Sequence, residues 1–358
     1  MDNIYREIKS SIDKIELSNL WPGFKPYEFA LYDDGKVYFE TFEIPISNQF
    51  VGNTSINYEG KQIAIWKIEE TDLNDIDLLT SSIIHEMFHA HQMTFGDNRF
   101  FNDLDGLSYP LEYENFNLKI NESRLLASAI REQNYNIKEE FFKKFLSVRQ
   151  RRFDLIGDNS TYEKSIETIE GTAEYLALAS LKIMNHDSYI KQLEKAMNRI
   201  TTINENFFDV RRMAYYTGAL ICLLADELSI DCKRAIEPDL QYNYDLITEK
   251  YSVETNMVIE LDENIEIHGL IDERNIRIRE LVDEIMASSN VEIIEGEFSV
   301  RGYDPMNMMR SDHFVYHKHF LGIQQDCETD FIMGPIVIET NGKDFSKFSR
   351  YYKITNNQ

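Results

Sequence analysis

Two histidines and a glutamate within residues 85–89, in the order His-Glu-Met-Phe-His, are the side chains of this sequence best suited to chemistry. On a helix, residues four apart project from one face, so the imidazoles of His85 and His89 can bind one zinc ion. Glu86 lies about 100° around the helix, where its carboxylate can take a proton from a zinc-bound water. The alternative interpretation is a helix with two ordinary histidines and a solvated glutamate, because so short a pattern also occurs by chance.

The third ligand must come from elsewhere, because a catalytic zinc ion needs three protein ligands and one open position for water. We predict Glu170, which forms a helical stripe with Glu167 and Glu174. Such a stripe is usually a solvated face. Here, however, small residues would let a second helix approach closely: Gly171, Ala173, Ala177 and Ala179. Glu174 is then expected to accept the spare N–H of a ligating histidine and fix its tautomer.

Other polar residues compete for the position of third ligand. Glu122 is the alternative to Glu170, but it lacks small neighbours, and we expect it to pair with an arginine such as Arg124, Arg151 or Arg152. His91 follows His89 by two residues and falls on another side of the helix. Three further histidines lie in a loop-rich C-terminal stretch and are interpreted as non-catalytic, although the sequence leaves their role open: His313, His317 and His319.

Tyr215 is the predicted donor to the oxyanion of a tetrahedral intermediate. It shares a helical face with small residues, whereas Tyr216 shares its face with Leu220 and Leu223. Helical phase therefore assigns Tyr216 to the core and Tyr215 to a cleft, where its phenol can supplement the metal. The alternative is a buried tyrosine whose hydroxyl is satisfied by the backbone.

The elements that must position these residues are predicted from hydrophobic spacing. Strand-like alternation over residues 27–68 predicts a small antiparallel sheet, and residues 50–56 can form an edge strand near the motif helix, where an extended substrate can add as a further strand. A plain hairpin strand explains that stretch equally well. Residues 78–228 are mainly helical, with Leu79, Ile83 and Ile84 leading into the motif.

The remainder of the chain changes in character after residue 236, where Glu237-Pro238 suggests a boundary. Mixed helices continue to about residue 289, and residues 291–355 return to strand patterns. The sequence therefore predicts an α+β protein with a catalytic domain over residues 1–236 and a helical and β-rich C-terminal domain over residues 237–358.

Charge and composition exclude several classes of partner. The chain has 37 Lys and Arg against 62 Asp and Glu, a net charge of −25, which would repel phosphate backbones and anionic lipid surfaces. We therefore expect neither a nucleic-acid nor a membrane partner. The N-terminal residues do not resemble a signal peptide, so we expect a cytoplasmic protein. Three widely spaced cysteines suit reduced thiols better than a zinc site: Cys222, Cys232 and Cys327.

Together these motifs resemble the gluzincins, the zinc peptidases that include thermolysin and the aminopeptidases with a catalytic tyrosine. The matching residues are the His-Glu-x-x-His pattern, Glu170-Gly-Thr-Ala, Glu174, and Tyr215 followed by Gly218. The resemblance implies a zincin-like fold. The interval between His89 and Glu170 is much longer than in those families, so two helices must be inserted. A looser likeness over most of the chain is to bacterial His-Glu-x-x-His proteins of no established substrate.

These observations predict a zinc metallopeptidase (hydrolase) whose substrate is a peptide or small protein. His85, His89 and Glu170 would hold zinc, Glu86 would act as the base, and Tyr215 would stabilise the oxyanion. Two alternatives remain open from the sequence: a non-catalytic binding or scaffold protein that kept the zincin architecture, and a zinc hydrolase of a non-peptide amide. The sequence does not determine cleavage specificity or oligomeric state.

Overall fold

The computed structural model describes residues 1–251, 253, 257–326 and 328–355. A first helix, α1 (Asp2–Ile12), precedes a five-stranded sheet within the predicted residues 27–68. The strands lie in the order β3-β2-β1-β5-β4, with bounds Phe29–Tyr32 (β1), Lys36–Tyr38 (β2), Glu43–Pro45 (β3), Thr54–Tyr58 (β4) and Lys61–Lys67 (β5).

The prediction that this sheet is antiparallel is wrong for one pair, because β1 runs parallel to β5. All four residues of β1 are buried. Phe29 and Leu31 belong to the main core, whereas Ala30 and Tyr32 belong to a smaller core that contains Phe50. Parallel pairs occur where both faces of a sheet are covered, and the central strand β1 meets that condition. The remaining pairs of this sheet are antiparallel.

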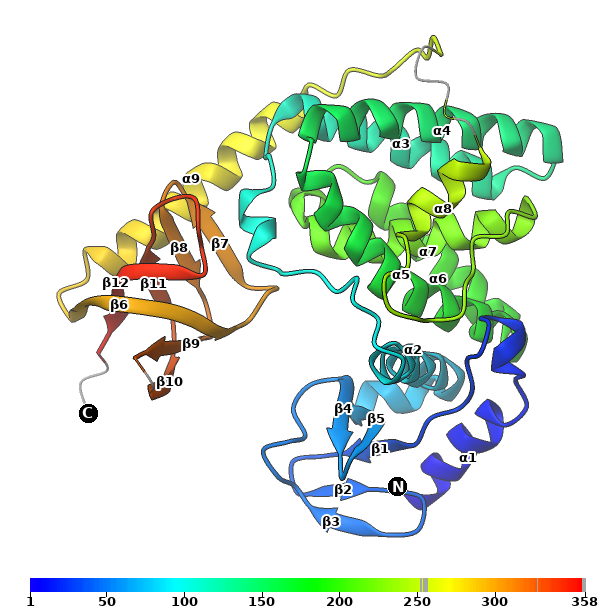
Figure 1. Cartoon of the computed structure of the whole chain (residues 1–358), viewed down its shortest axis with the longest axis horizontal. Helices are drawn as coiled ribbons and strands as arrows, with labels where there is room; N and C mark the ends of the chain where they lie inside the picture. Colours follow the sequence, from blue (N-terminus) through cyan, green and yellow to red (C-terminus); the bar gives the residue numbers. More distant parts are fainter. Residues whose placement is uncertain (252, 254–256, 327, 356–358) are drawn as a thin grey trace.

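Helix α2 (Ile76–Thr94) carries the His-Glu-x-x-His pattern and packs on β4 and β5 (Figure 1). Asp75 caps its first turn, because the Asp75 carboxylate accepts a hydrogen bond from the Leu78 amide. Most residues of α2 are buried, since the sheet covers one side and another helix, α5, covers the other. Strand β4 is at one edge of this sheet, because among the described strands it pairs only with β5. The predicted edge strand is therefore confirmed at residues 54–56.

A group of helices follows α2, as predicted for residues 78–228. These are α3 (Tyr113–Arg131), α4 (Tyr135–Ile156), α5 (Asn159–Met184), α6 (His186–Thr201) and α7 (Val210–Glu227). Short 3₁₀ turns occur at Leu17–Asn19, Glu70–Asn74, Asp105–Ser108 and Glu205–Phe208. Helices α3 and α4 lie between α2 and α5 in the chain, which confirms that two helices are inserted between the elements of the motif.

The main hydrophobic core continues past residue 236. Tyr244 and Ile247 of α8 (Asn243–Lys250) belong to this core, as do Ile267 and Ile271 of α9 (Glu266–Met286). Val282 and Ile285, near the end of α9, belong instead to a core shared with the C-terminal strands. The packing therefore changes within α9, later in the chain than the predicted boundary after residue 236.

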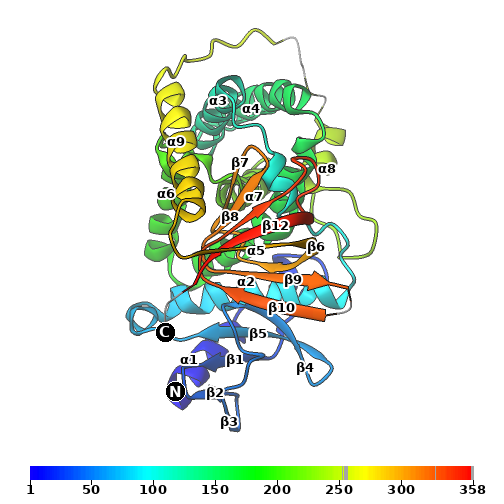
Figure 2. The ribbon, with the colours of Figure 1, turned by 90° about the vertical axis from the view of Figure 1, so that its left-hand side faces the viewer.

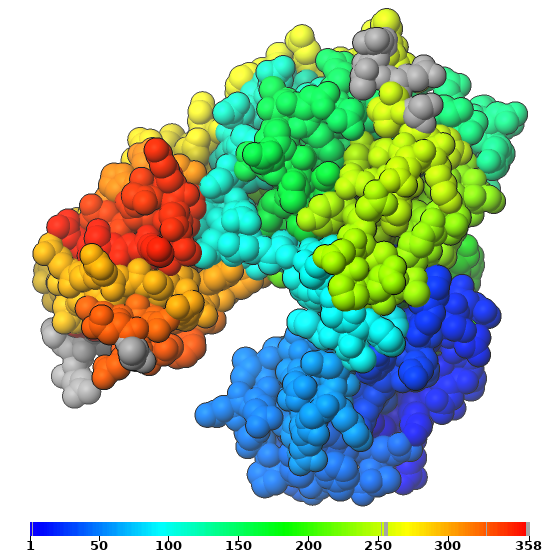
Figure 3. Space-filling model, in the orientation of Figure 1, coloured from blue at the N-terminus to red at the C-terminus, as the bar shows by residue number. Residues whose placement is uncertain are grey.

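The C-terminal part is a seven-stranded antiparallel sheet with α9 packed along it (Figure 2). Its order is β10-β9-β6-β12-β11-β8-β7, with bounds Val291–Tyr303 (β6), Met308–Ser311 (β7), Phe314–His317 (β8), Phe320–Gln325 (β9), Glu328–Met333 (β10), Ile336–Glu339 (β11) and Lys347–Ile354 (β12). Figure 3 shows a wide recess between this sheet and the N-terminal sheet.

The predicted α+β class is confirmed by two sheets joined through a helical middle part. Over the residues that the structure describes, no helix combines the length and apolar character needed to cross a membrane. Cys222 and Cys232 are buried free thiols, as predicted, and Cys327 lies outside the described residues.

Candidate metal centre

Three side chains from two helices bring their ligand atoms together at one point. His85 and His89 come from α2 and Glu170 from α5, and the three ligand atoms lie within 4.8 Å of one another. His89 Nε2 is 3.1 Å from His85 Nε2 and 3.1 Å from Glu170 Oε2, and His85 Nε2 is 3.5 Å from Glu170 Oε2. Ligand atoms at ~2.1 Å from a tetrahedral zinc ion are ~3.4 Å apart. The donor set and its spacing therefore fit a zinc ion.

Each histidine uses its other ring nitrogen to contact a neighbouring acceptor. His89 Nδ1 lies 2.8 Å from Gln92 Oε1, and Gln92 Nε2 donates to the Ile169 carbonyl at 3.1 Å. His85 Nδ1 lies 3.4 Å from Glu174 Oε2, as predicted for Glu174. A proton on Nδ1 of either ring leaves the Nε2 lone pair directed at the common point, which is the tautomer that metal binding requires.

Glu86 lies beside this group and not in solvent. It is only 9% exposed, so the alternative of a solvated glutamate is wrong. Burial raises the pKa of the Glu86 carboxyl, the two histidines lower it, and Glu170 and Glu174 raise it further. A carboxyl with a raised pKa beside the candidate ligand atoms is suited to act as a general base.

The ligand carboxylate itself is held ionised. Burial raises the pKa of Glu170, but His89 and His85 more than offset that effect, and the pKa lies well below its usual range. Burial lowers the pKa of His85, whereas hydrogen bonds with Glu170 and Glu174 raise it to about 10. Without a bound metal ion, protons on the histidines and the Arg211 guanidinium, 3.3 Å from Glu170 Oε1, supply the positive charge beside these carboxylates.

Close packing of α5 on α7 places Glu170 next to Tyr215. A Cβ atom on Gly171 would lie 2.6 Å from the Gly218 Cα, and one on Gly218 would lie 2.5 Å from the Glu167 carbonyl oxygen. Only glycine is compatible with such short separations at both positions. The predicted approach of a second helix at the small residues is confirmed.

Tyr215 points toward the metal ligands. Its ring lies 6.4 Å from the His85 ring at an interplanar angle of 19°. Burial raises the pKa of the Tyr215 phenol, as do the charge of Glu170 and a hydrogen bond to it. Tyr216 packs against the main core, as predicted, but it is only half-buried and also lines a small surface cavity with Arg199 and Arg212. Helical phase distinguished the directions of the two tyrosine side chains. It did not predict that both would be buried to a similar extent.

Arg211 is a site residue that the sequence did not indicate. Its guanidinium lies 3.3 Å from Glu170 Oε1 and 2.9 Å from Asp103 Oδ1, and it lies 5.5 Å from the centre of the Tyr215 ring. It also donates to Met306 Sδ of the C-terminal part at 3.0 Å. The position of Arg211 in the sequence could have indicated this role, because Arg211 is one helical turn before Tyr215 and so lies on the same face of the helix.

The alternative third ligand, Glu122, lies in a different environment. Both of its carboxylate oxygens accept from Arg152, at 2.7 and 2.8 Å, which confirms the predicted pairing with one of the named arginines. Glu122 is not part of the group around His85. The remaining histidines are also elsewhere: His91 packs among aromatic rings, His317 is buried in the C-terminal sheet, and His319 pairs with Asp304.

Comparison with known proteins adds no relative. No family model matches the chain, and no curated protein or solved structure matches it. The interpretation of the site therefore rests on its residues and their geometry.

Proposed function

We propose that this protein is a zinc-dependent hydrolase, and specifically a metallopeptidase of the zincin type. One observation carries the proposal: His85, His89 and Glu170 converge within 4.8 Å, although they come from helices far apart in the sequence. Two histidines and a carboxylate are the ligand set of several zinc peptidases. The buried Glu86 beside them favours a catalytic site over a structural one, because a structural zinc site needs no neighbouring base.

When bound, zinc would polarise the scissile carbonyl and lower the pKa of the attacking water. The protein residues supply the remaining steps. Glu86 takes a proton from the water and passes it to the leaving amine. In this structure Tyr215 is hydrogen-bonded to Glu170. During the reaction its hydroxyl group donates instead to the oxyanion of the tetrahedral intermediate. Glu174 and Gln92 hold the two imidazoles in the orientation that ligation requires.

A peptide is the substrate class that the surroundings favour. One edge of the N-terminal sheet is β4, which packs against the motif helix α2. An extended peptide can add to such an edge through main-chain hydrogen bonds. The recess between the two sheets opens beside the N-terminal sheet (Figure 3).

Metal analysis and one substitution test the proposal. The purified protein should contain one zinc ion per chain, and His85→Ala should remove it. Glu86→Gln should retain zinc and lose turnover of a quenched-fluorescence peptide library by a factor of about 10²–10⁴. Glu7→Gln, on the exposed surface of α1, is the matched control and should change neither quantity. Absence of zinc, or turnover that survives Glu86→Gln, would contradict the proposal.

A further inference from the structure

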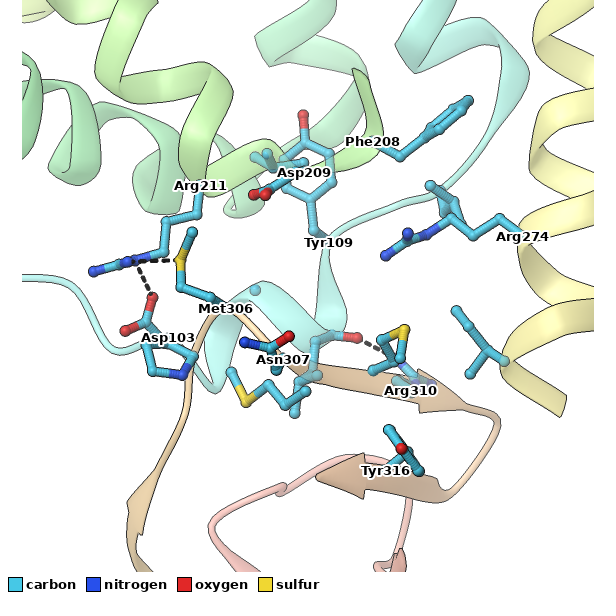
Figure 4. Close-up of a pocket in the computed structure, with 18 of the residues that line it drawn as sticks. Asp103, Tyr109, Phe208, Asp209, Arg211, Arg274, Met306, Asn307, Arg310 and Tyr316 are labelled. Carbon is cyan, nitrogen blue, oxygen red and sulfur yellow. Dashed lines mark hydrogen bonds and ion pairs between the residues drawn. The ribbon is translucent and has the colours of Figure 1, made fainter. Parts of the chain in front are cut away.

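A large cavity lies next to the candidate metal centre, where the helical part meets the C-terminal sheet. Its volume is about 1120 Å³. Five segments that are distant in the sequence line it: residues 103–112, Tyr162 of α5, residues 205–212 at and just before the start of α7, residues 274–281 of α9 and residues 305–318 around β7 and β8. Figure 4 shows residues that line it from these elements. This volume slightly exceeds the usual range for ligand sites, about 300–1,000 Å³.

One wall of the cavity is shared with the metal centre. Asp103, Arg211 and Met306 lie at one end of it (Figure 4). The same Arg211 guanidinium that pairs with Asp103 also lies 3.3 Å from Glu170. A molecule in the cavity would therefore be separated from the ligand carboxylate by a single side chain.

The charges of the cavity differ from those of the whole protein. The chain carries a net charge of −25, yet the lining contains six basic side chains: Arg211, Arg212, Arg274, Arg277, Arg310 and Lys318. Three of these are neutralised by carboxylates of the same lining, in the pairs Arg211–Asp103, Arg212–Asp209 and Arg277–Glu205.

Two half-buried arginines have no carboxylate partner. Arg274 makes no hydrogen bond or ion pair with any residue that the structure describes, and burial and the neighbouring Arg277 lower its pKa. Arg310 donates only to neutral carbonyl oxygens, those of Leu107 at 3.0 Å and Asp312 at 2.7 Å. A guanidinium removed from water without a counter-ion is costly, so both positions favour an anionic ligand.

The carboxylates that face the cavity without a basic partner lie at its rim. Glu112 and Asp312 are both exposed, so water solvates their charges. Asp209 and Glu205 both act on Arg274, but Asp209 is already paired with Arg212 at 3.3 Å and Glu205 with Arg277. The uncompensated charge in the interior of the cavity is therefore positive.

We propose that this cavity binds a carboxylate group of the peptide substrate, with Arg274 and Arg310 as the residues that recognise it. The inference deepens the proposed function, because it takes a peptide as the molecule that the metal centre acts on. Planar guanidinium groups match a carboxylate with paired hydrogen bonds. Met306, Met308 and Leu107 line the same space and can pack against the aliphatic carbons of the bound residue. The carboxylate can belong to an acidic side chain or to the C-terminus of the peptide.

Direct binding tests the proposal without requiring turnover. The full-length Glu86→Gln variant is titrated into fluorescein-labelled decapeptides, and anisotropy is recorded. One peptide carries three glutamates and an amidated C-terminus, a second has glutamines and a free C-terminus, and a third has glutamines and an amidated C-terminus. We expect the first or the second to bind at least tenfold more tightly than the third, and whichever does so identifies the source of the carboxylate.

Substitution of the arginines locates the binding. Arg274→Gln and Arg310→Gln should each weaken binding of the preferred peptide by about 10–100-fold, the effect of losing one charge-assisted hydrogen-bonding group. Arg274→Lys, which keeps the charge, should restore part of the affinity. Arg279→Gln is the matched control, because Arg279 lies exposed on the same helix outside the cavity. Circular dichroism and Tm confirm that each variant is folded.

The outcomes separate this inference from the proposed function. Equal affinity for the three peptides, or equal binding by Arg274→Gln and Arg279→Gln, would overturn the carboxylate site even if the protein contains zinc and cleaves peptides. Selective binding that depends on Arg274 in a protein without zinc would support the carboxylate site and end the hydrolase proposal.

Discussion

Helix α5 carries buried glutamates in two different electrostatic environments. In its first half, Glu163 accepts from Arg152 Nη1 at 2.6 Å and from Lys119 at 2.7 Å, and Glu167 pairs with Arg149. In its middle, Glu170 faces two imidazoles. The side chains of Glu163 and Arg152 have no exposed surface, whereas the Glu170 side chain is 12% exposed.

The difference lies in the partners of the carboxylates. Arginine is always protonated and has no lone pair to offer, so the buried pairs around Glu163 form a fixed network that a metal ion cannot enter. Imidazole can lose its proton and then offers a lone pair. The same residue type on one helix is therefore structural beside Arg152 and can bind a metal beside His89.

The sharpest test of this comparison is the same substitution at both positions of α5. Glu163→Gln should lower the free energy of unfolding by about 3–5 kcal/mol, because it leaves Arg152 and Lys119 buried with an incomplete counter-charge. The zinc content of the folded protein should be unchanged. Urea denaturation followed by circular dichroism, with metal analysis of the native fraction, measures both quantities.

Glu170→Gln should give the opposite result. Loss of the ligand carboxylate should remove stoichiometric zinc. The metal-free variant should lose less stability than Glu163→Gln, because His85 and His89 can release the protons that Glu170 balances, whereas Arg152 cannot. If Glu163→Gln loses zinc while Glu170→Gln retains it, the assignment of the two environments is wrong.

A smaller effect is expected at Glu174, which contacts His85 Nδ1 at 3.4 Å without belonging to the ligand set. Glu174→Gln should weaken zinc binding by about 10–100-fold, because the imidazole loses a charged acceptor that fixes its tautomer. Competition with a chromophoric chelator measures the change. Glu273→Gln, on the exposed surface of α9, serves as the control, and an equal loss of affinity in both variants would exclude a specific role for Glu174.

The smallest expected effect is a pH dependence of the stability of the metal-free protein. The pKa of His85 is raised from its ordinary 6.5 to about 10, so its pairing with Glu170 and Glu174 stabilises the fold fully below pH 6.5. That stabilisation is lost as the pH rises toward 10. Zinc binding displaces the proton, so the affinity for zinc should rise with pH, by about 1.4 kcal/mol per pH unit for each proton released.

Thermal unfolding of metal-free and zinc-loaded protein between pH 6.5 and 9 measures this effect. Other groups titrate alike in both forms, so the difference between the two Tm values should increase with pH. A difference that stays constant would show that the histidines are already neutral without metal.

The sequence predicted the helical parts of the site because their signals are local. The i, i+4 spacing of His85 and His89 and the apolar residues around them define one face of α2. The small residues after Glu170 indicated close packing, and the structure shows that contact at Gly171 and Gly218. The assignment of Glu122 to an arginine also followed from its neighbours.

Features that depend on contacts between distant segments were either not predicted or predicted wrongly. Periodicity shows that a strand is buried but not which strand pairs with it, so the parallel pairing of β1 with β5 was not predicted. Arg211 contacts Asp103 and Met306, which lie in two other parts of the chain. No local sequence pattern predicts contacts between such distant residues. The shared core of α8 and α9 likewise depends on how the helices dock.

The sequence by itself determined the chemical groups of this protein: two imidazoles, a base and a carboxylate on amphipathic helices. Only the tertiary structure decided which carboxylates are locked by arginine and which face histidine, because α5 presents glutamates of equal local character to both. It also decided that five distant segments line a cavity in which Arg274 and Arg310 lack carboxylate partners. Local propensity fixes which groups a helix carries, whereas long-range packing fixes what those groups meet.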